Sequence, residues 1–177
     1  MFCAFLYDER HAYDVNSLVQ YLQDAKSGKA RIYTSTVTMA EIRSSKIQKP
    51  EYGSMIDLLN DFEGAAVPVA ASIHIMDLAG RLKDIPYSKA GEKGRALSTG
   101  DAIMLATCLL IPDVYGVTID AFHTYDDGRK PRVIPLLSYH EWCEGLTGEA
   151  AALADRVKAL KRERPHYPQA RLSFQKE

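Results

Sequence analysis

The chain has 177 residues, of which 46% are hydrophobic and 25% are charged, and its formal net charge is −1. This size and composition are typical of one globular domain, and so small a charge argues against a surface that binds nucleic acid all over through phosphates. The three cysteines, Cys3, Cys108 and Cys143, show no spacing typical of a disulfide framework or a zinc site, and they favour a reducing cytoplasm.

Apolar residues recur at helical spacing in some segments, and β-branched or aromatic residues gather in others. The chain opens on MFCAFLY, which is apolar from its first residue and resembles the middle of a buried element. Helices are expected over residues 12–26, 40–47, 52–62, 73–83, 98–110 and 149–163. Strands are expected over residues 30–38, 65–70, 115–120 and 133–136. A polar loop is expected over 84–95, and a loose tail after 163.

The alternation of strands with helices predicts an α/β fold with a parallel sheet covered on both faces. In such sheets the functional crevice lies at the carboxyl ends of the strands, so acidic residues near those ends are candidates for a site. No apolar stretch is long enough to span a membrane, and the first ten residues lack the features of a secretory signal. We therefore expect no membrane partner.

Two acidic residues are expected in the first turn of a helix. Glu41 follows the strand that ends near Thr36, and the alternative for an acid there is that it only favours the helix dipole. Asp101 follows Ser98 and Thr99, both natural N-cap residues, and the alternative is that it serves only as the acid of a capping box. The helix after Asp101 is apolar nearly all round, so this acid lies next to a low-dielectric interior and needs a donor, a cation or a metal.

A third acid, Asp120, closes the expected strand GVTID, in which Thr118 shares its face. The alternative is an Asp that only forms a turn before Ala121. Glu41, Asp101 and Asp120 together lie at element ends on one rim of the expected sheet. Carboxylates without His or Cys suit Mg²⁺ or Mn²⁺, which can activate a water and neutralise the charge that develops on a phosphodiester.

Three segments resemble motifs of the PIN-domain family, in particular its VapC-type toxin ribonucleases. TSTVTMAEIRSS resembles the second motif, in which an acid follows a strand with Ser or Thr, LSTGDAIMLATCLL resembles the third, and VTIDAFHTY resembles the fourth. The resemblance implies a three-layer α/β/α fold with a central parallel sheet, and Mg²⁺ or Mn²⁺ held by Glu41, Asp101 and Asp120 with support from Thr118. It also implies metal-assisted cleavage of RNA, inhibition by an antitoxin protein, and a homodimer.

The likeness covers roughly the first four-fifths of the chain, so residues 1–145 are expected to form a PIN-like domain and residues 146–177 a C-terminal helix and tail. The family's first motif is a strand that ends in Asp just before the first helix. It has no counterpart here, and Asp8 comes too late to replace it. The first strand is therefore missing or truncated: either the reading frame begins upstream, or this member is degenerate. We expect the chain as written to bind divalent metal poorly and to cut RNA slowly.

Two other functions remain open. A non-catalytic PIN-like module would bind RNA or a protein partner, and a carboxylate nuclease directed at DNA would use the same acids. His123, close to Asp120, is expected to be a surface histidine, with contact to a phosphate as the alternative. The basic residues near the end of the chain are expected to form a solvated face, or to contact RNA or an acidic partner. They are Arg156, Lys158, Lys161, Arg162 and Arg164.

Overall fold

The computed structural model describes residues 1–128 and 132–168, and within them the chain is a mixed α/β protein. Its helices are α1 (Phe2–Leu6), α2 (Val15–Lys26), α3 (Val37–Glu41), α4 (Met55–Asp61), α5 (Ile73–Lys83), α6 (Thr99–Tyr115) and α7 (Gly148–Ala159), with the short helical turns η1 (Ser44–Lys46) and η2 (Tyr139–Trp142). Its strands are β1 (Ile32–Ser35), β2 (Ala66–Val69), β3 (Ser88–Lys89), β4 (Glu92–Lys93), β5 (Phe122–His123) and β6 (Arg162–Glu163).

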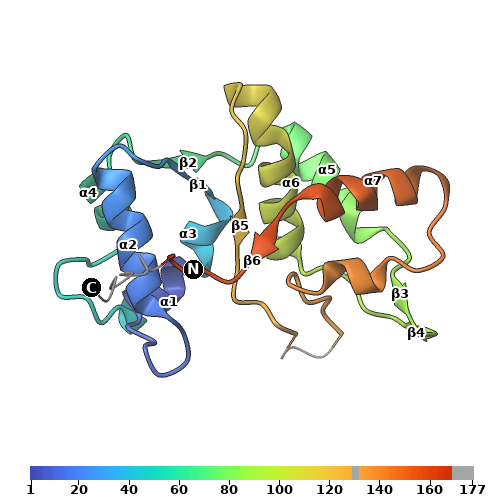
Figure 1. Cartoon of the computed structure of the whole chain (residues 1–177), viewed down its shortest axis with the longest axis horizontal. Coiled ribbons are helices and arrows are strands. Elements are labelled where there is room, and N and C mark those ends of the chain that lie inside the picture. Colours follow the sequence, from blue (N-terminus) through green and yellow to red (C-terminus); the bar gives the residue numbers. More distant parts are fainter. Residues whose placement is uncertain (129–131, 169–177) are drawn as a thin grey trace, which may run out of the picture.

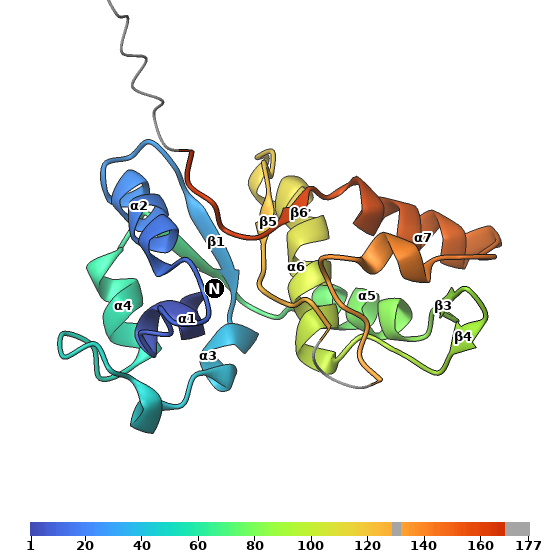
Figure 2. The same ribbon diagram turned by 60° about the horizontal axis from the view of Figure 1, so that its bottom comes forward.

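The elements gather into two lobes, seen in Figures 1 and 2. The N-terminal lobe contains α1 to α4 with β1 and β2, the C-terminal lobe contains α5, α6, α7 and the β3–β4 hairpin, and β5 and β6 lie between them. Each lobe has its own apolar core. Leu18 and Leu58 belong to the core of the N-terminal lobe, and Leu82 and Leu105 to that of the C-terminal lobe.

Local sequence explains where the long helices begin and end. Asp14, Ser72 and Ser98 each cap one helix, because the side chain of each accepts a hydrogen bond from a backbone N–H in the first turn. Helix α6 ends at Gly116, whose φ of 64° lies in the left-handed region that favours glycine. The helices expected over 12–26, 73–83 and 98–110 are confirmed, and the last continues to Tyr115. None of the described helices is long and apolar enough to cross a membrane.

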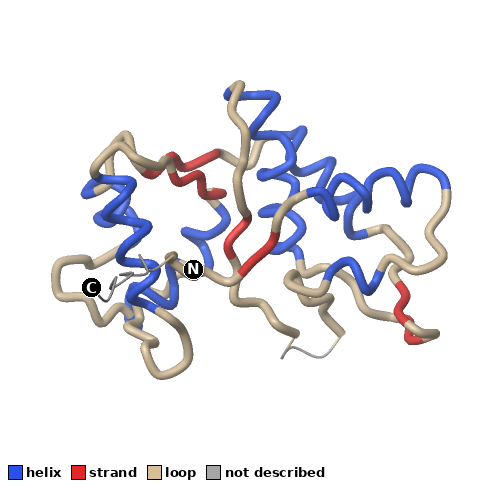
Figure 3. Tube along the Cα trace, in the orientation of Figure 1, coloured by secondary structure: helices blue, strands red, loops and turns tan. Residues whose placement is uncertain are grey.

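The strands pair in three short sheets, which are coloured red in Figure 3. β1 and β2 run parallel, with Ile32 opposite Ala66, and β5 and β6 also run parallel, with Phe122 opposite Arg162. β3 and β4 form an antiparallel hairpin inside the segment expected to be a loop. The α/β class with parallel strand pairs is confirmed. Because each described sheet has two strands, the three-layer PIN-like arrangement stays a prediction.

The prediction of a strand over residues 115–120 is wrong. Tyr115 is the last residue of α6, and no strand pairs with residues 117–121 in the described part of the chain. The strand begins later, at β5, because the N–H of Phe122 donates to the carbonyl of Lys161 at 2.8 Å. Apolar, β-branched composition does not hold a strand by itself, since the strand also needs a hydrogen-bonded neighbour.

Two further expectations are corrected. The strand expected over 133–136 is reduced, in the described residues, to one bridge between Val133 and Ala96, again because no neighbouring strand lies along it. The helix expected over 40–47 begins earlier, because the residue after β1 is already helical, and it ends at Glu41. Glu41 therefore lies in the last turn of α3 and not in the first turn of a helix.

The C-terminal segment packs against the rest of the protein. Leu153 and Val157 of α7 are buried in the core of the C-terminal lobe, and the expected domain boundary lies between η2 and α7. Beyond β6, the hydroxyl of Tyr167 donates to Asp24 of α2 at 2.7 Å, so the chain returns to the N-terminal lobe. The end of the expected tail, 169–177, lies outside the described residues.

Replacing Leu58 by Ala is expected to lower the free energy of unfolding by about 2–5 kcal/mol, because its side chain is fully buried and its loss leaves a cavity. Ile56→Ala in the same helix is the control. Ile56 is 54% exposed, so its truncation should cost about 0.5 kcal/mol or less. Chemical denaturation followed by circular dichroism measures both variants. Equal losses would contradict the burial of Leu58.

Candidate functional site

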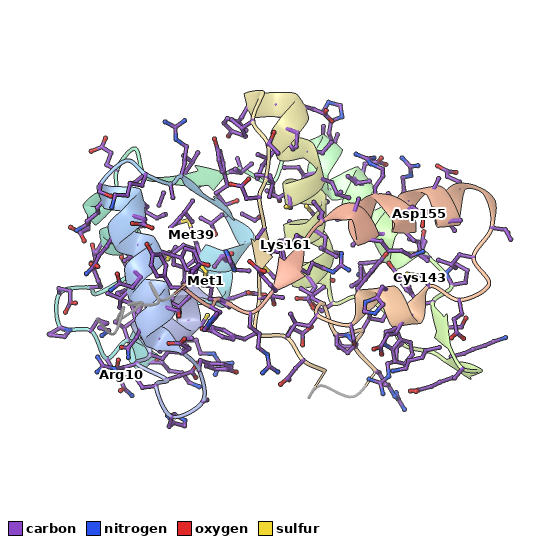
Figure 4. The ribbon with its side chains drawn as sticks, in the orientation of Figure 1. Met1, Arg10, Met39, Cys143, Asp155 and Lys161 are labelled. Carbon is purple, nitrogen blue, oxygen red and sulfur yellow. The ribbon has the colours of Figure 1, made fainter. Side chains whose placement is uncertain are left out.

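A pocket of about 360 Å³ lies between the two lobes. This volume is within the range of ligand pockets, roughly 300–1,000 Å³. Its walls are residues 30–35, which contain β1, residues 118–124, which contain β5, one stripe of α6, and the start of the chain with α1. Figure 4 shows Met1, a part of this wall, in the N-terminal lobe, and Cys143 and Asp155 in the C-terminal lobe.

The carboxylate of Glu41 lies at the N-terminal turn of α6. Its carboxylate lies so close to Gly100 that a Cβ atom at that position would overlap Oε1. Gly100 precedes Asp101, so Glu41 approaches the helix turn that carries the second acid. Glu41 also lines the pocket and lies near the start of the chain. Burial raises the pKa of the Cys3 thiol there, and the Glu41 carboxylate raises it further.

Ser98 caps α6 and forms two hydrogen bonds with Asp101. The N–H of Asp101 donates to Ser98 Oγ at 3.1 Å, and the Ser98 hydroxyl donates to the Asp101 carboxylate. Of the two N-cap residues expected from the sequence, Ser98 is the cap, and the Asp101 carboxylate accepts a hydrogen bond from its hydroxyl. Capping and metal binding are compatible, because an ionised carboxylate accepts on both of its oxygens.

Thr118 and Asp120 lie on the opposite wall of the pocket, in the segment between α6 and β5. Both residues are exposed. The Glu163 carboxylate, 2.8 Å from Lys161 Nζ, raises the pKa of that lysine, and the charge of Asp120 raises it further. Asp120 therefore shares the pocket with Glu41 and has a basic neighbour in Lys161.

The three acids have the right chemistry for a hard divalent cation, because carboxylate oxygens are the ligands that Mg²⁺ and Mn²⁺ prefer. Their placement does not yet match that chemistry. Among the described residues, no group of three or more His, Cys, Asp or Glu side chains is arranged to hold a metal ion. Glu41 approaches the turn of Asp101, and Glu41 shares the pocket with Asp120, but the three carboxylates do not converge on one point.

His123 is a pocket residue that the sequence pattern missed. The expected surface histidine is instead 19% exposed, lines the pocket and packs against Tyr21, with ring centroids 4.7 Å apart and the ring planes tilted by 45°. Its Nδ1 is buried and has no hydrogen-bond partner within residues 1–128 and 132–168, and the Glu163 carboxylate lies 4.0 Å away. This environment follows from the pairing of β5 with β6, which no local sequence pattern indicates.

The basic residues near the end of the chain are mostly paired within the protein. Ion pairs hold three of them: Lys158 with Asp155, Lys161 with Glu163, and Arg164 with Asp127. Arg162 is half-buried and donates to backbone carbonyls of the C-terminal lobe. Surface ion pairs of this kind are weak, so the exposed members fit the expected solvated face and leave contact with a polyanion open, whereas Arg162 does not belong to that face.

Stability is expected to fall on acidification because of His123. Burial lowers the pKa of its imidazole below the ordinary value near 6.5, Glu163 opposes that change, and Lys161 adds to it. The unfolded chain therefore takes up the proton first, so the contribution of neutral His123 is complete above about pH 6.5 and is lost as the pH falls towards the lowered pKa. Thermal melts at about pH 7.5 and about pH 5.5 measure this effect. Between the two pH values, the Tm of His123→Gln should fall less than the Tm of the parent chain. His11→Gln, at an exposed position, is the control, and a parent-like pH dependence of His123→Gln would contradict the prediction.

No family model matches the chain, and neither the curated proteins nor the solved structures gave a match. The candidate site therefore depends on its residues, their geometry and the resemblance of its motifs.

Proposed function

We propose that this protein is a divalent-metal-dependent ribonuclease of the PIN type, with Glu41, Asp101 and Asp120 as metal ligands and Thr118 as a supporting residue. The observation that carries the proposal is the position of Glu41. Its carboxylate lies on the turn that contains Asp101, and it lines the pocket that Asp120 also lines. Three separate parts of the chain thus supply acids in the neighbourhood of one pocket.

The residues of the chain have distinct tasks in this proposal. When bound, Mg²⁺ or Mn²⁺ supplies a water of lowered pKa and positive charge against the phosphodiester. The hydroxyl of Ser98 fixes the direction of the Asp101 carboxylate, so this ligand is ordered before any cation arrives. Thr118 presents a hydroxyl on the wall opposite Glu41, where it can donate a hydrogen bond to a phosphate oxygen.

The proposed substrate is RNA, and the proposed partners are an antitoxin protein and a second copy of the chain. These partners follow from the resemblance of the motifs and stay predictions. Light scattering on the purified protein tests the dimer directly.

A non-catalytic module that binds RNA or a protein is the second candidate. It is favoured by the finding that the described residues bring no three metal-binding side chains together. Such a module would retain RNA or partner binding and would show no cleavage that depends on a divalent cation.

Asp101→Asn is expected to lower RNA cleavage with Mg²⁺ or Mn²⁺ at least about 100-fold, because loss of a ligand should exceed the roughly 10–100-fold effect of losing an outer partner. Asp113→Asn, at an exposed position in the same helix, is the matched control and should cleave like the parent chain. Labelled single-stranded RNA is incubated with each protein, with and without a chelator, over times long enough for slow turnover. Equal cleavage by the parent and Asp101→Asn would contradict the assignment of Asp101 as a metal ligand. RNA binding without cleavage by any of them would favour the non-catalytic module.

Gly100→Ala tests the contact of Glu41 with α6. The new methyl group would overlap the Glu41 carboxylate, which must move away, so metal affinity and cleavage should both fall at least about tenfold. Gly80→Ala in α5 is the control, because a Cβ there meets nothing within 4 Å while the gain in helix propensity is similar. Manganese binding by calorimetry, cleavage and thermal stability are compared. Parent-like manganese binding by Gly100→Ala would remove Glu41 from the site.

A further inference from the structure

The pocket between the lobes is bounded on one side by an unpaired edge of β1. The N–H groups of Ile32 and Thr36 donate towards β2, at 2.8 and 3.0 Å. Backbone groups alternate in direction along a strand, so those of Tyr33 and Ser35 point away from β2. Both residues line the pocket, and no second strand pairs with β1 in the described ranges. This edge of β1 therefore presents backbone donors and acceptors to the pocket.

The opposite wall of the pocket, which contains β5, also has an unpaired strand edge. The N–H groups of Phe122 and Thr124 donate to carbonyls of the β6 segment, at 2.8 and 3.0 Å. By the same alternation, the backbone groups of Ala121 and His123 point away from β6, and both residues line the pocket. Within the part of the chain that the structure describes, β5 pairs with β6 alone. Two strand edges thus face one pocket from opposite sides.

Helices cover the two remaining sides of the pocket. One stripe of α6 side chains at helical spacing lines one of these sides, and residues of α1 and α2 line the other. The α6 stripe consists of Met104, Thr107, Cys108 and Ile111. The facing residues are Phe2, Cys3 and Tyr21. A pocket with strand edges on two sides and helices above and below has the form of a vacant strand position in a sheet covered on both faces.

We propose that this pocket is a strand slot, which accepts one extended apolar peptide segment between the β1 edge (Tyr33, Ser35) and the β5 edge (Ala121, His123). The peptide would pair on both sides and join the β2–β1 and β5–β6 ladders into one sheet. Since β1 has four residues, roughly four to six residues of peptide fit alongside it at about 3.3 Å each. A strand covered on both faces is apolar and β-branched throughout, so the partner is a Val- and Ile-rich segment.

The backbone edges select a peptide over other occupants. A small apolar molecule could fill the pocket, but it would leave the N–H and C=O groups of both edges without partners. A strand satisfies these groups, and it also covers the apolar stripe of α6. This inference goes beyond the proposed nuclease function and does not rest on it, because the test below measures peptide binding and no cleavage.

The experiment uses the full 177-residue chain and a soluble synthetic peptide with alternating Val and Ile, capped at both ends and flanked by Lys. Its matched control has one central Val replaced by N-methylvaline, which keeps the side chain and removes one N–H. We expect the first peptide to bind and to slow hydrogen exchange at the amides of Tyr33, Ser35, Ala121 and His123. The N-methylated peptide should bind at least about tenfold more weakly.

A variant that fills part of the pocket tests whether the peptide binds there. Met104→Trp places a larger side chain in the α6 stripe and should abolish the protection by the peptide. Met76→Trp, at a residue of α5 that is 46% exposed, is its control and should bind as the parent does. Thermal melts establish that both variants fold.

Three results with the peptide would overturn the strand slot. They are absence of peptide binding to the parent chain, equal affinity for the N-methylated peptide, and unchanged binding by a folded Met104→Trp variant. Protection of the same amides by a single-stranded oligonucleotide, without any by the peptide, would also overturn it and would assign the pocket to nucleic acid. Failure of the nuclease assays leaves these measurements unaffected, so the two proposals fail separately.

Discussion

Helix α6 contacts α3 and β1 from the N-terminal lobe and α5 and α7 from the C-terminal lobe. Its side chains from Ala102 to Leu109 are buried in nearly every direction. A helix this apolar has to be covered on all sides, and this requirement holds the two lobes together. α5 and α7 cover one part of its surface, and the pocket faces a stripe that remains. The position of Asp101, at the start of this helix, is fixed by the same packing.

The helices could be predicted from the sequence because the signals that form them are local. Asp14, Ser72 and Ser98 precede apolar residues at helical spacing, and each of them caps its helix in the structure. Gly116 ends α6 through its left-handed conformation, and the helix continues past the expected end at Leu110 with Pro112 inside it. Strand β2 was also expected, with Pro68 inside it. The α/β class follows from these elements.

The rest of the sheet could not be predicted, because a strand depends on a partner that lies far away in the sequence. Phe122 and His123 form a strand through Arg162 and Glu163, whose segment was expected to be helical. The buried environment of His123 has the same origin. Local pattern placed Glu41 near a helix but in the wrong turn, and it gave no sign of the contact with Gly100. The candidate acids could therefore be named from the sequence, whereas their distances depend on pairings that it does not display.

The proposed strand slot and the candidate acids Glu41 and Asp120 lie at the same pocket. Glu41 follows β1 through α3, and Asp120 comes just before β5, so the separation of these two strands limits how closely the two acids approach. A strand paired on both sides would fix that separation at two strand spacings, each about 4.8 Å. In the described residues no strand pairs with both β1 and β5, so their separation is set by side-chain packing, since Tyr33 and Phe122 both contact the core that contains α6.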